Sequence, residues 1–152
     1  MKRVLAIVGF MLLSTPAAAF AEQGLSLSVA AGPAHDVAGD ASAVGSAGVV
    51  RLGWRWSSGF ALMATAVPVI DVPDGASPSH AFGGGIRQSF RIGAYEPYLE
   101  ASLVAADGPA ALLGGGIAWR FAPEFHVGLF ADALIADGTR TLMEGLELVR
   151  FF

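Results

Sequence analysis

Apolar and polar residues alternate along most of the chain beyond residue 22, in segments separated by glycine, proline, aspartate and serine. Alternation with a period of two places successive side chains on opposite faces of a β-strand. Eight segments show this pattern, and the predicted strands are 24–33, 46–57, 59–71, 80–92, 95–106, 111–121, 125–136 and 140–151. The chain is therefore predicted to be all-β with an even number of strands.

The alternation separates large apolar residues from polar and small ones. In the segment 46–57, Trp54 falls on one face, whereas Arg51 and Arg55 fall on the other. The fourth and sixth segments divide in the same way, with arginine and glycine opposite the large apolar residues. Apolar residues facing out and polar residues facing in are typical of transmembrane barrels. The pattern predicts an eight-stranded antiparallel up-and-down transmembrane β-barrel.

The connections alternate between tight and longer ones. The tight ones lie at 57–59, 93–94 and 122–124, and the longer ones near 34–45, 72–79, 107–110 and 137–139. Short periplasmic turns and longer outer loops are typical of outer-membrane barrels. Aromatic residues concentrate near the tight-turn end, which predicts a periplasmic aromatic girdle: Trp54, Trp56, Phe60, Phe90, Tyr95, Trp119, Phe121 and Phe125.

The first of two informative tight turns predicts charge pairs inside the barrel. A two-residue hairpin loop at 93–94 places Arg91 opposite Glu96 and Arg87 opposite Glu100. Both pairs then point inward, where they can neutralise each other.

The second turn predicts a further pair of inward polar residues and a glycine placed opposite an aromatic ring. A three-residue connection at 122–124 places Arg120 opposite His126, and Gly116 opposite Phe130, so that the glycine leaves space for the ring. An eight-stranded barrel is only wide enough for side chains. The inward polar residues are therefore predicted to fill the lumen as a structural network: Arg51, Arg55, Arg87, Arg91, Glu96, Glu100, Arg120, His126 and Asp132.

The last strand allows two orientations. If Phe151 faces outward, Glu147 faces lipid; if Phe152 faces outward, Glu144 and Arg150 do. A bulge or an early exit from the bilayer could reconcile either arrangement with the rest of the barrel.

The N-terminus has the organisation of a secretory signal peptide. A basic start at Lys2 and Arg3 is followed by an apolar run and by the small-residue site Ala19-Phe20-Ala21, so residues 1–21 are predicted to be cleaved and 22–152 to form the barrel. The remaining chain has seven arginines and thirteen acidic residues, a formal charge of −6, which argues against a nucleic-acid partner. It contains no cysteine, which excludes disulfides and thiolate metal sites.

These features together resemble the small eight-stranded outer-membrane proteins of Gram-negative bacteria, the OmpA-like and OmpX-like barrels. The resemblance is carried by the export signal, the phrase Tyr95-Glu-Pro-Tyr-Leu-Glu-Ala-Ser-Leu103, the glycine-rich strands and the aromatic terminus Leu148-Val-Arg-Phe-Phe152. It implies an outer-membrane location and lipid contacts. It also implies that the barrel-assembly machinery, which reads a terminal aromatic signal, is a transient partner.

The three histidines are interpreted as structural or solvated residues rather than as catalytic or metal-binding ones. His126 is interpreted as a lumen residue, and His35 and His80 as solvated residues near the outer loops, so no catalytic residue, metal or cofactor is predicted. The favoured function is a structural, envelope-integrity or surface-interaction role, with the ligand unknown. Two alternatives stay open: a lipid A-modifying hydrolase using His80 with Ser77 or Ser79, and a soluble periplasmic lipocalin-like barrel with its apolar residues inside.

Overall fold

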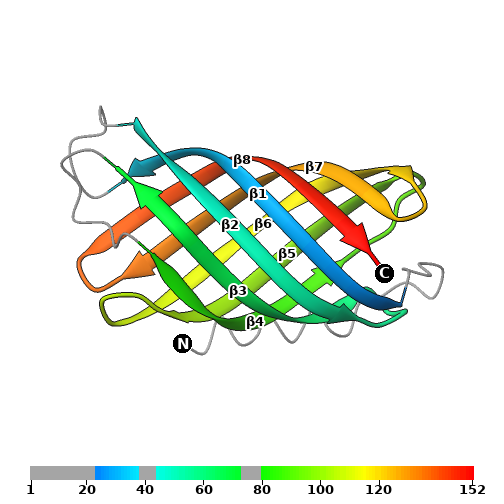
Figure 1. The fold of residues 1–152 in the computed structure, drawn as a ribbon, viewed down its shortest axis with the longest axis horizontal. Helices are drawn as coiled ribbons and strands as arrows, with labels where there is room; N and C mark the ends of the chain where they lie inside the picture. Colours follow the sequence, from blue (N-terminus) through cyan, green and yellow to red (C-terminus); the bar gives the residue numbers. More distant parts are fainter. Residues whose placement is uncertain (1–22, 38–43, 73–79) are drawn as a thin grey trace.

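The computed structural model describes residues 23–37, 44–72 and 80–152, and the predicted signal peptide at 1–21 lies outside these ranges. Eight antiparallel strands form one closed barrel in sequence order (Figure 1). The strands are β1 (Gly24–Asp36), β2 (Val44–Arg55), β3 (Phe60–Asp71), β4 (Ala81–Ser89), β5 (Tyr95–Ala105), β6 (Pro109–Ala122), β7 (Phe125–Ala136) and β8 (Thr139–Phe151). The predicted fold class is confirmed.

The barrel closes because β1 pairs with β8 as well as with β2. The β1–β8 register runs from Ser26 opposite Phe151 to Asp36 opposite Thr141. At the end of the seam, the Phe152 amide donates to the Leu25 carbonyl at 2.9 Å. A closed barrel leaves no unpaired strand edge, which is the requirement for a sheet surrounded by lipid. Among the described residues, no helix is long and apolar enough to cross a bilayer.

The tight turns produce the predicted registers. Ile92 and Tyr95 exchange both backbone hydrogen bonds, at 2.8 and 3.1 Å, around the 93–94 loop. The positive φ of 64° at Gly93 suits this turn to glycine. The predicted pairing of Arg87 with Glu100 across β4 and β5 is confirmed.

The β6–β7 turn gives the same result with one irregularity. Arg120 lies opposite His126, and Gly116 opposite Phe130, as predicted. A bulge then shifts the register so that Ala122 lies opposite Phe125. The bulge accommodates an extra residue on β6 without turning the inward face outward.

Several predicted boundaries were wrong. β1 continues to Asp36 and β2 begins at Val44, inside the expected loop 34–45, whereas β4 ends at Ser89 rather than at 92. The connections expected to be long at 107–110 and 137–139 are short, because Pro109 begins β6 and Thr139 begins β8. At the long-connection end, β1, β2, β6 and β8 thus extend further than the glycine and proline content indicated, because ladder pairing with neighbours outweighs the local turn preference. Residues 38–43 and 73–79 lie outside the described ranges.

A second bulge lies in β3. Gly48 pairs with Val69, but Val50 pairs with Ala66, so β3 carries one extra residue. Pro68 lies within this irregularity, where its missing N–H costs no ladder hydrogen bond. The bulge shifts the alternation of inward residues by one position: Val67 faces the lumen on one side of it and Ile70 on the other. Both parts of β3 therefore present an apolar residue to the lumen.

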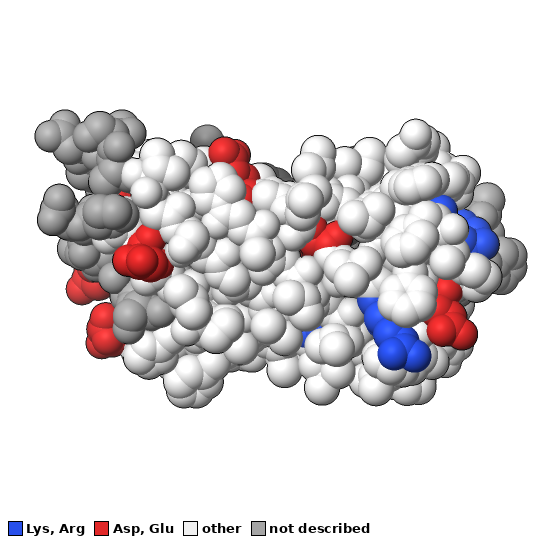
Figure 2. Space-filling view, turned by 45° about the horizontal axis from the view of Figure 1, so that its top comes forward, with Lys and Arg blue, Asp and Glu red and all other residues white. Residues whose placement is uncertain are grey.

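The outside of the barrel is apolar and the inside carries the charges. Trp54 is 46% exposed and Leu129 is 59% exposed, whereas Arg51 is 2% exposed. Figure 2 shows a face that is largely uncharged, with arginine side chains toward the end where the tight turns lie. This is the polarity of a transmembrane barrel rather than of a water-soluble one. The lipocalin-like alternative, which needs the aromatic residues inside, does not fit this arrangement.

Candidate functional site

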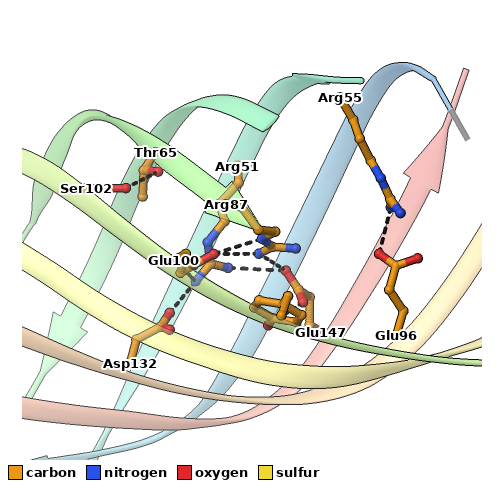
Figure 3. Close-up of polar contacts among 10 residues, drawn as sticks. Arg51, Arg55, Thr65, Arg87, Glu96, Glu100, Ser102, Asp132 and Glu147 are labelled. Carbon is orange, nitrogen blue, oxygen red and sulfur yellow. Dashed lines mark hydrogen bonds and ion pairs between the residues drawn. The ribbon is translucent and has the colours of Figure 1, made fainter. Parts of the chain in front are cut away.

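The middle of the lumen holds a group of buried charges drawn from five strands. We call Arg51 (β2), Arg87 (β4), Glu100 (β5), Asp132 (β7) and Glu147 (β8) the central charge cluster (Figure 3). Each belongs to the inward-facing set of its strand, which is why residues far apart in the sequence meet here. The cluster links opposite walls of the barrel through side chains.

Arg51 is the most connected member of the cluster. Its Nη2 lies 2.5 Å from Glu100 Oε1 and also pairs with Asp132 Oδ2, and its Nη1 donates to Glu147 Oε1 at 3.4 Å. One guanidinium thus contacts carboxylates from three other strands. Removing it would leave several buried carboxylates short of a counter-charge, which is costly in a medium of low dielectric constant.

Arg87 completes the cluster from the other side. Its Nε donates to Glu100 Oε2 at 2.9 Å, and its Nη2 donates to Glu147 Oε1 at 2.7 Å. The guanidinium also lies 3.9 Å from the centre of the Tyr98 ring, while the Tyr98 hydroxyl donates to Glu147 Oε2 at 2.6 Å. Tyr98 therefore stabilises both an arginine and a carboxylate of the cluster.

A separate ion pair lies closer to the tight-turn end. Arg55 Nη1 donates to Glu96 Oε1 at 2.6 Å, and the Arg55 guanidinium lies 5.1 Å from the Phe151 ring centre. His126 Nδ1 is 3.8 Å from Glu96 Oε2, and its ring is 4.7 Å from that of Phe151. These side chains lie between the central charge cluster and the mouth of the lumen.

Glu96 has an ion-pair partner that the turn did not predict, because Arg55 reaches it from β2. The predicted position of Arg91 opposite Glu96 lies in the turn, beyond the regular β4–β5 ladder, which stops at Ser89 opposite Tyr98. Arg91 and Arg120 are half-buried and line a small pocket at the tight-turn end.

The free volume inside the lumen is small. A cavity of about 20 Å³ lies between the central charge cluster and the Arg55–Glu96 pair, lined in part by Ser28, Tyr98 and His126. Such a volume has room for about one or two water molecules. The space that remains between these two groups of charges is therefore small.

The other half of the lumen is apolar, whereas the sequence pattern predicted a polar interior throughout. The inward positions toward the long-connection end form one buried cluster: Ala30, Ala34, Ala47, Val49, Val67, Ile70, Ala81, Val104, Ala110, Leu112, Phe130, Leu134 and Met143. Because the outer wall is apolar too, these strand segments read as continuous apolar runs rather than as alternating ones. The lumen is thus divided into an apolar half and a charged half.

Two glycines of β6 make room for neighbouring side chains, and the ring nearest to Gly116 is that of Tyr98 rather than that of Phe130, which the sequence had predicted. An added Cβ at Gly114 would lie 1.8 Å from Asp132 Oδ1, and one at Gly116 would lie 2.2 Å from the Leu129 carbonyl oxygen and 2.7 Å from the Tyr98 hydroxyl. The absence of side chains at these positions makes room for the charge cluster and its tyrosine.

Gly116→Ala is expected to lower the free energy of unfolding by about 1–3 kcal/mol, the usual cost of overpacking a well-packed site. The backbone of β7 and the Tyr98 ring must both shift to admit the methyl group. Urea titration of the barrel in lipid vesicles measures the effect. Gly108→Ala is the matched control, because nothing lies within 4 Å of its added Cβ. Equal stability of the two variants would contradict the close packing described here.

The predicted girdle residues lie at the tight-turn end with differing exposure. Trp54, Trp56, Tyr95, Trp119 and Phe121 are exposed, whereas Phe60, Phe90 and Phe125 are half-buried. Some of these rings pack on one another in pairs: Trp56 with Phe60 at 5.7 Å, Trp119 with Phe121 at 6.2 Å, and Phe121 with Phe125 at 6.1 Å between centroids.

The sequence analysis missed Glu147 and Tyr98 as members of the lumen network. Both are buried, and Glu147 is only 1% exposed. The structure adopts the orientation with Phe152 outward, which turns Phe151, Val149 and Glu147 inward without a bulge in β8. The unpaired arginines of the predicted network were the signal that favoured this orientation, because they require a further inward carboxylate.

The outward charges of β8 have partners suited to their positions. Glu144 lies 3.7 Å from His35 Nε2 on β1, and Arg150 lies over the rings of Phe125 and Phe152. Arg150 lies at the end of β8, where an outward charge can reach the bilayer surface, whereas Glu144 lies near the middle of the strand.

The residues proposed for chemistry are not assembled in the part of the chain that is described. Within 23–37, 44–72 and 80–152, no group of three or more histidine, aspartate or glutamate side chains is arranged to hold a metal. His80 is exposed, and Ser77 and Ser79 lie outside the described residues.

Comparison with known proteins supports the fold without supplying a close relative. No protein-family model matches the chain, and no curated protein matches it in sequence. Similar solved structures include one described as a de novo design of transmembrane β-barrels, with a TM-score of 0.57 and 14% identity over 85% of this chain and 98% of that one. Neisserial surface protein A (NspA) is also similar, with a TM-score of 0.51 and 15% identity over 84% and 95% of the two chains. The chain has the fold of a small, eight-stranded transmembrane β-barrel.

Proposed function

We propose that this protein is an integral outer-membrane β-barrel of a Gram-negative bacterium, with a structural role in the integrity of the envelope and no enzymatic activity. The observation that carries the proposal is the set of side-chain contacts inside the barrel. Its charged half binds five strands together through the central charge cluster, and its apolar half is packed with aliphatic side chains and Phe130. A barrel filled in this way offers a rigid wall rather than a passage for solutes.

The short connections favour this role over recognition of a surface ligand. At the end opposite the tight turns, β5 and β6 are joined by residues 106–108, and β7 and β8 by residues 137–138. Recognition sites on barrels are usually built from long loops. Surface interaction would therefore have to depend on the β1–β2 and β3–β4 connections.

Export, assembly and the orientation of the barrel in the bilayer complete the proposal. The signal peptide at 1–21 would direct export, and the barrel-assembly machinery would recognise β8 with its terminal Phe152. The aromatic girdle would lie at the periplasmic boundary of the bilayer, where amphipathic rings such as Trp119 and Tyr95 are favoured.

A deletion strain is expected to be more sensitive to detergent than its parent. Expression of the whole chain should restore resistance, and so should a variant whose 37–43 and 72–80 segments are replaced by short turns. The control is heat-modifiability on a gel of purified outer membranes, which verifies that each variant forms a closed barrel there. If the loop-replaced barrel folds but fails to restore resistance, the role lies in surface recognition and the structural proposal is wrong.

The purified barrel is expected to carry no steady ionic current in a planar bilayer. Ions would have to pass both the aliphatic half of the lumen and the paired charges, and the cavity between them is only about 20 Å³. A designed or natural barrel of larger strand number, inserted in the same bilayer, supplies the positive control. A stable, stepwise conductance that scales with the amount of inserted protein would refute the closed lumen.

A further inference from the structure

Arg150 is unusual among the arginines because it faces outward beside aromatic rings. Its guanidinium carbon lies 5.5 Å from the Phe125 ring centre and 4.6 Å from that of Phe152. Within the described part of the chain, no carboxylate forms an ion pair with it. The rings orient the guanidinium while its N–H donors remain available for a planar or tetrahedral anion.

An apolar groove lies on the same side of the barrel. It has a volume of about 280 Å³ and is lined mainly by Tyr95, Ile117, Trp119, Val127, Leu129 and Leu146. These residues come from β5, β6, β7 and β8, and inward-facing Ala118 and Gly128 form its floor. The small floor residues leave the space between the larger side chains open.

The strand register places the arginine next to the groove. Phe125 pairs with Arg150, Val127 with Leu148, and Leu129 with Leu146. These pairs form three successive outward rows, which are about 7 Å apart because every second residue of a strand faces outward. The β6 neighbours of the second and third rows are Trp119 and Ile117. Arg150 therefore lies one row nearer the tight-turn end than the groove.

We propose that Arg150 and this groove together bind one anionic phospholipid of the leaflet at the tight-turn end. The phosphate would contact the Arg150 guanidinium, and one acyl chain would lie in the groove. The inference rests on the proposed function, because it requires the barrel to span a bilayer with this end at the periplasmic leaflet.

The dimensions and charges fit this ligand. From the Arg150 row to the Leu146 row is about 13 Å along the strand, or ~10 Å along the membrane normal for a strand tilted by about 40°, which lies within the ~15 Å half-thickness of the hydrocarbon core. A zwitterionic lipid carries its own ammonium group beside the phosphate, whereas an anionic lipid leaves its charge for the arginine. The site should therefore select phosphatidylglycerol over phosphatidylcholine.

Trp119 allows the site to be tested directly. In a Trp54→Phe/Trp56→Phe background, Trp119 is the only tryptophan, and it lines the groove. The whole mature barrel is inserted into phosphatidylcholine vesicles containing acyl-brominated phosphatidylglycerol or acyl-brominated phosphatidylcholine, whose bromines quench tryptophan fluorescence. We expect an association constant about fivefold higher for phosphatidylglycerol, which corresponds to the ~1 kcal/mol that one basic residue contributes at an anionic membrane surface.

Three variants and one competitor separate the explanations. Arg150→Gln should reduce the preference to about onefold, Arg150→Lys should retain most of it, and Arg140→Gln should leave it unchanged. Arg140 is the matched control because it is an exposed arginine at the other end of β8. Millimolar inorganic phosphate should not alter the quenching, because the acyl chain provides part of the affinity.

The outcomes for the site and for the proposed function are distinct. A heat-modifiable, inserted barrel with equal quenching by both lipids, or one whose preference survives Arg150→Gln, overturns the lipid site alone. Competition by inorganic phosphate also overturns it, in favour of a simple anion site. A chain that does not insert into vesicles overturns the membrane placement and the lipid site with it.

Discussion

Replacing Arg51 with methionine is expected to lower the free energy of unfolding by about 3–5 kcal/mol, the range found when one partner of a buried ion pair is removed. Arg51 contacts Glu100, Asp132 and Glu147, and after its removal Arg87 is the only guanidinium left in the central charge cluster. Methionine replaces the apolar stem of Arg51 but not its guanidinium, so the loss would combine the missing charge with the space that the guanidinium leaves. Urea unfolding in lipid vesicles, followed by tryptophan fluorescence, gives the free energy.

Two further variants identify the cause of that loss. Arg140→Met removes an exposed arginine from the rim of the barrel and should change stability by no more than about 0.5 kcal/mol. The double variant Arg51→Met/Asp132→Leu should be less destabilised than the sum of the single variants, because each change removes the unpaired partner that the other creates. Additive losses, or a stable Arg51→Met barrel, would show that the cluster is hydrated and contributes little to the fold.

Leu129→Arg is expected to destabilise the barrel in a bilayer by about 2–4 kcal/mol, the cost of an arginine on the lipid face near the midplane. Leu129 is 59% exposed and lies in the central part of β7. In water, an exposed leucine of this kind could be replaced with a change within about 0.5 kcal/mol. Unfolding titrations in vesicles measure this effect, which depends on the surrounding solvent rather than on contacts within the protein.

Leu129→Ala separates the charge from the loss of the side chain. It should cost clearly less than Leu129→Arg in vesicles, because alanine remains compatible with lipid. The arginine variant should also show a gradient, with a smaller cost when the same substitution is made at Leu25, which lies near the end of β1. If arginine at neither position lowers the free energy of unfolding, the apolar surface does not contact lipid.

The strands, their order and the local pairings were determined by the sequence itself. Period-two alternation identified all eight strands because a barrel wall has two chemically different faces. Turn length then predicted Arg87 opposite Glu100 and Gly116 opposite Phe130, since a hairpin connection determines which residues of its two strands are paired. These features depend only on residues close together in the sequence, so they can be predicted without knowing how the rest of the chain folds.

Only the closed tertiary structure decided which inward residues contact one another in the lumen. Arg51 and Glu147 are 96 residues apart, and Arg55 and Glu96 are 41 apart, so no turn relates them. They meet because closure of β8 on β1 sets the stagger of the strands around the barrel and brings inward residues from opposite walls to one height. The same closure turns Glu147 inward and collects aliphatic residues at the other end of the lumen. Alternation shows which face a residue occupies, but only the stagger of the closed sheet decides which residues it contacts across the interior.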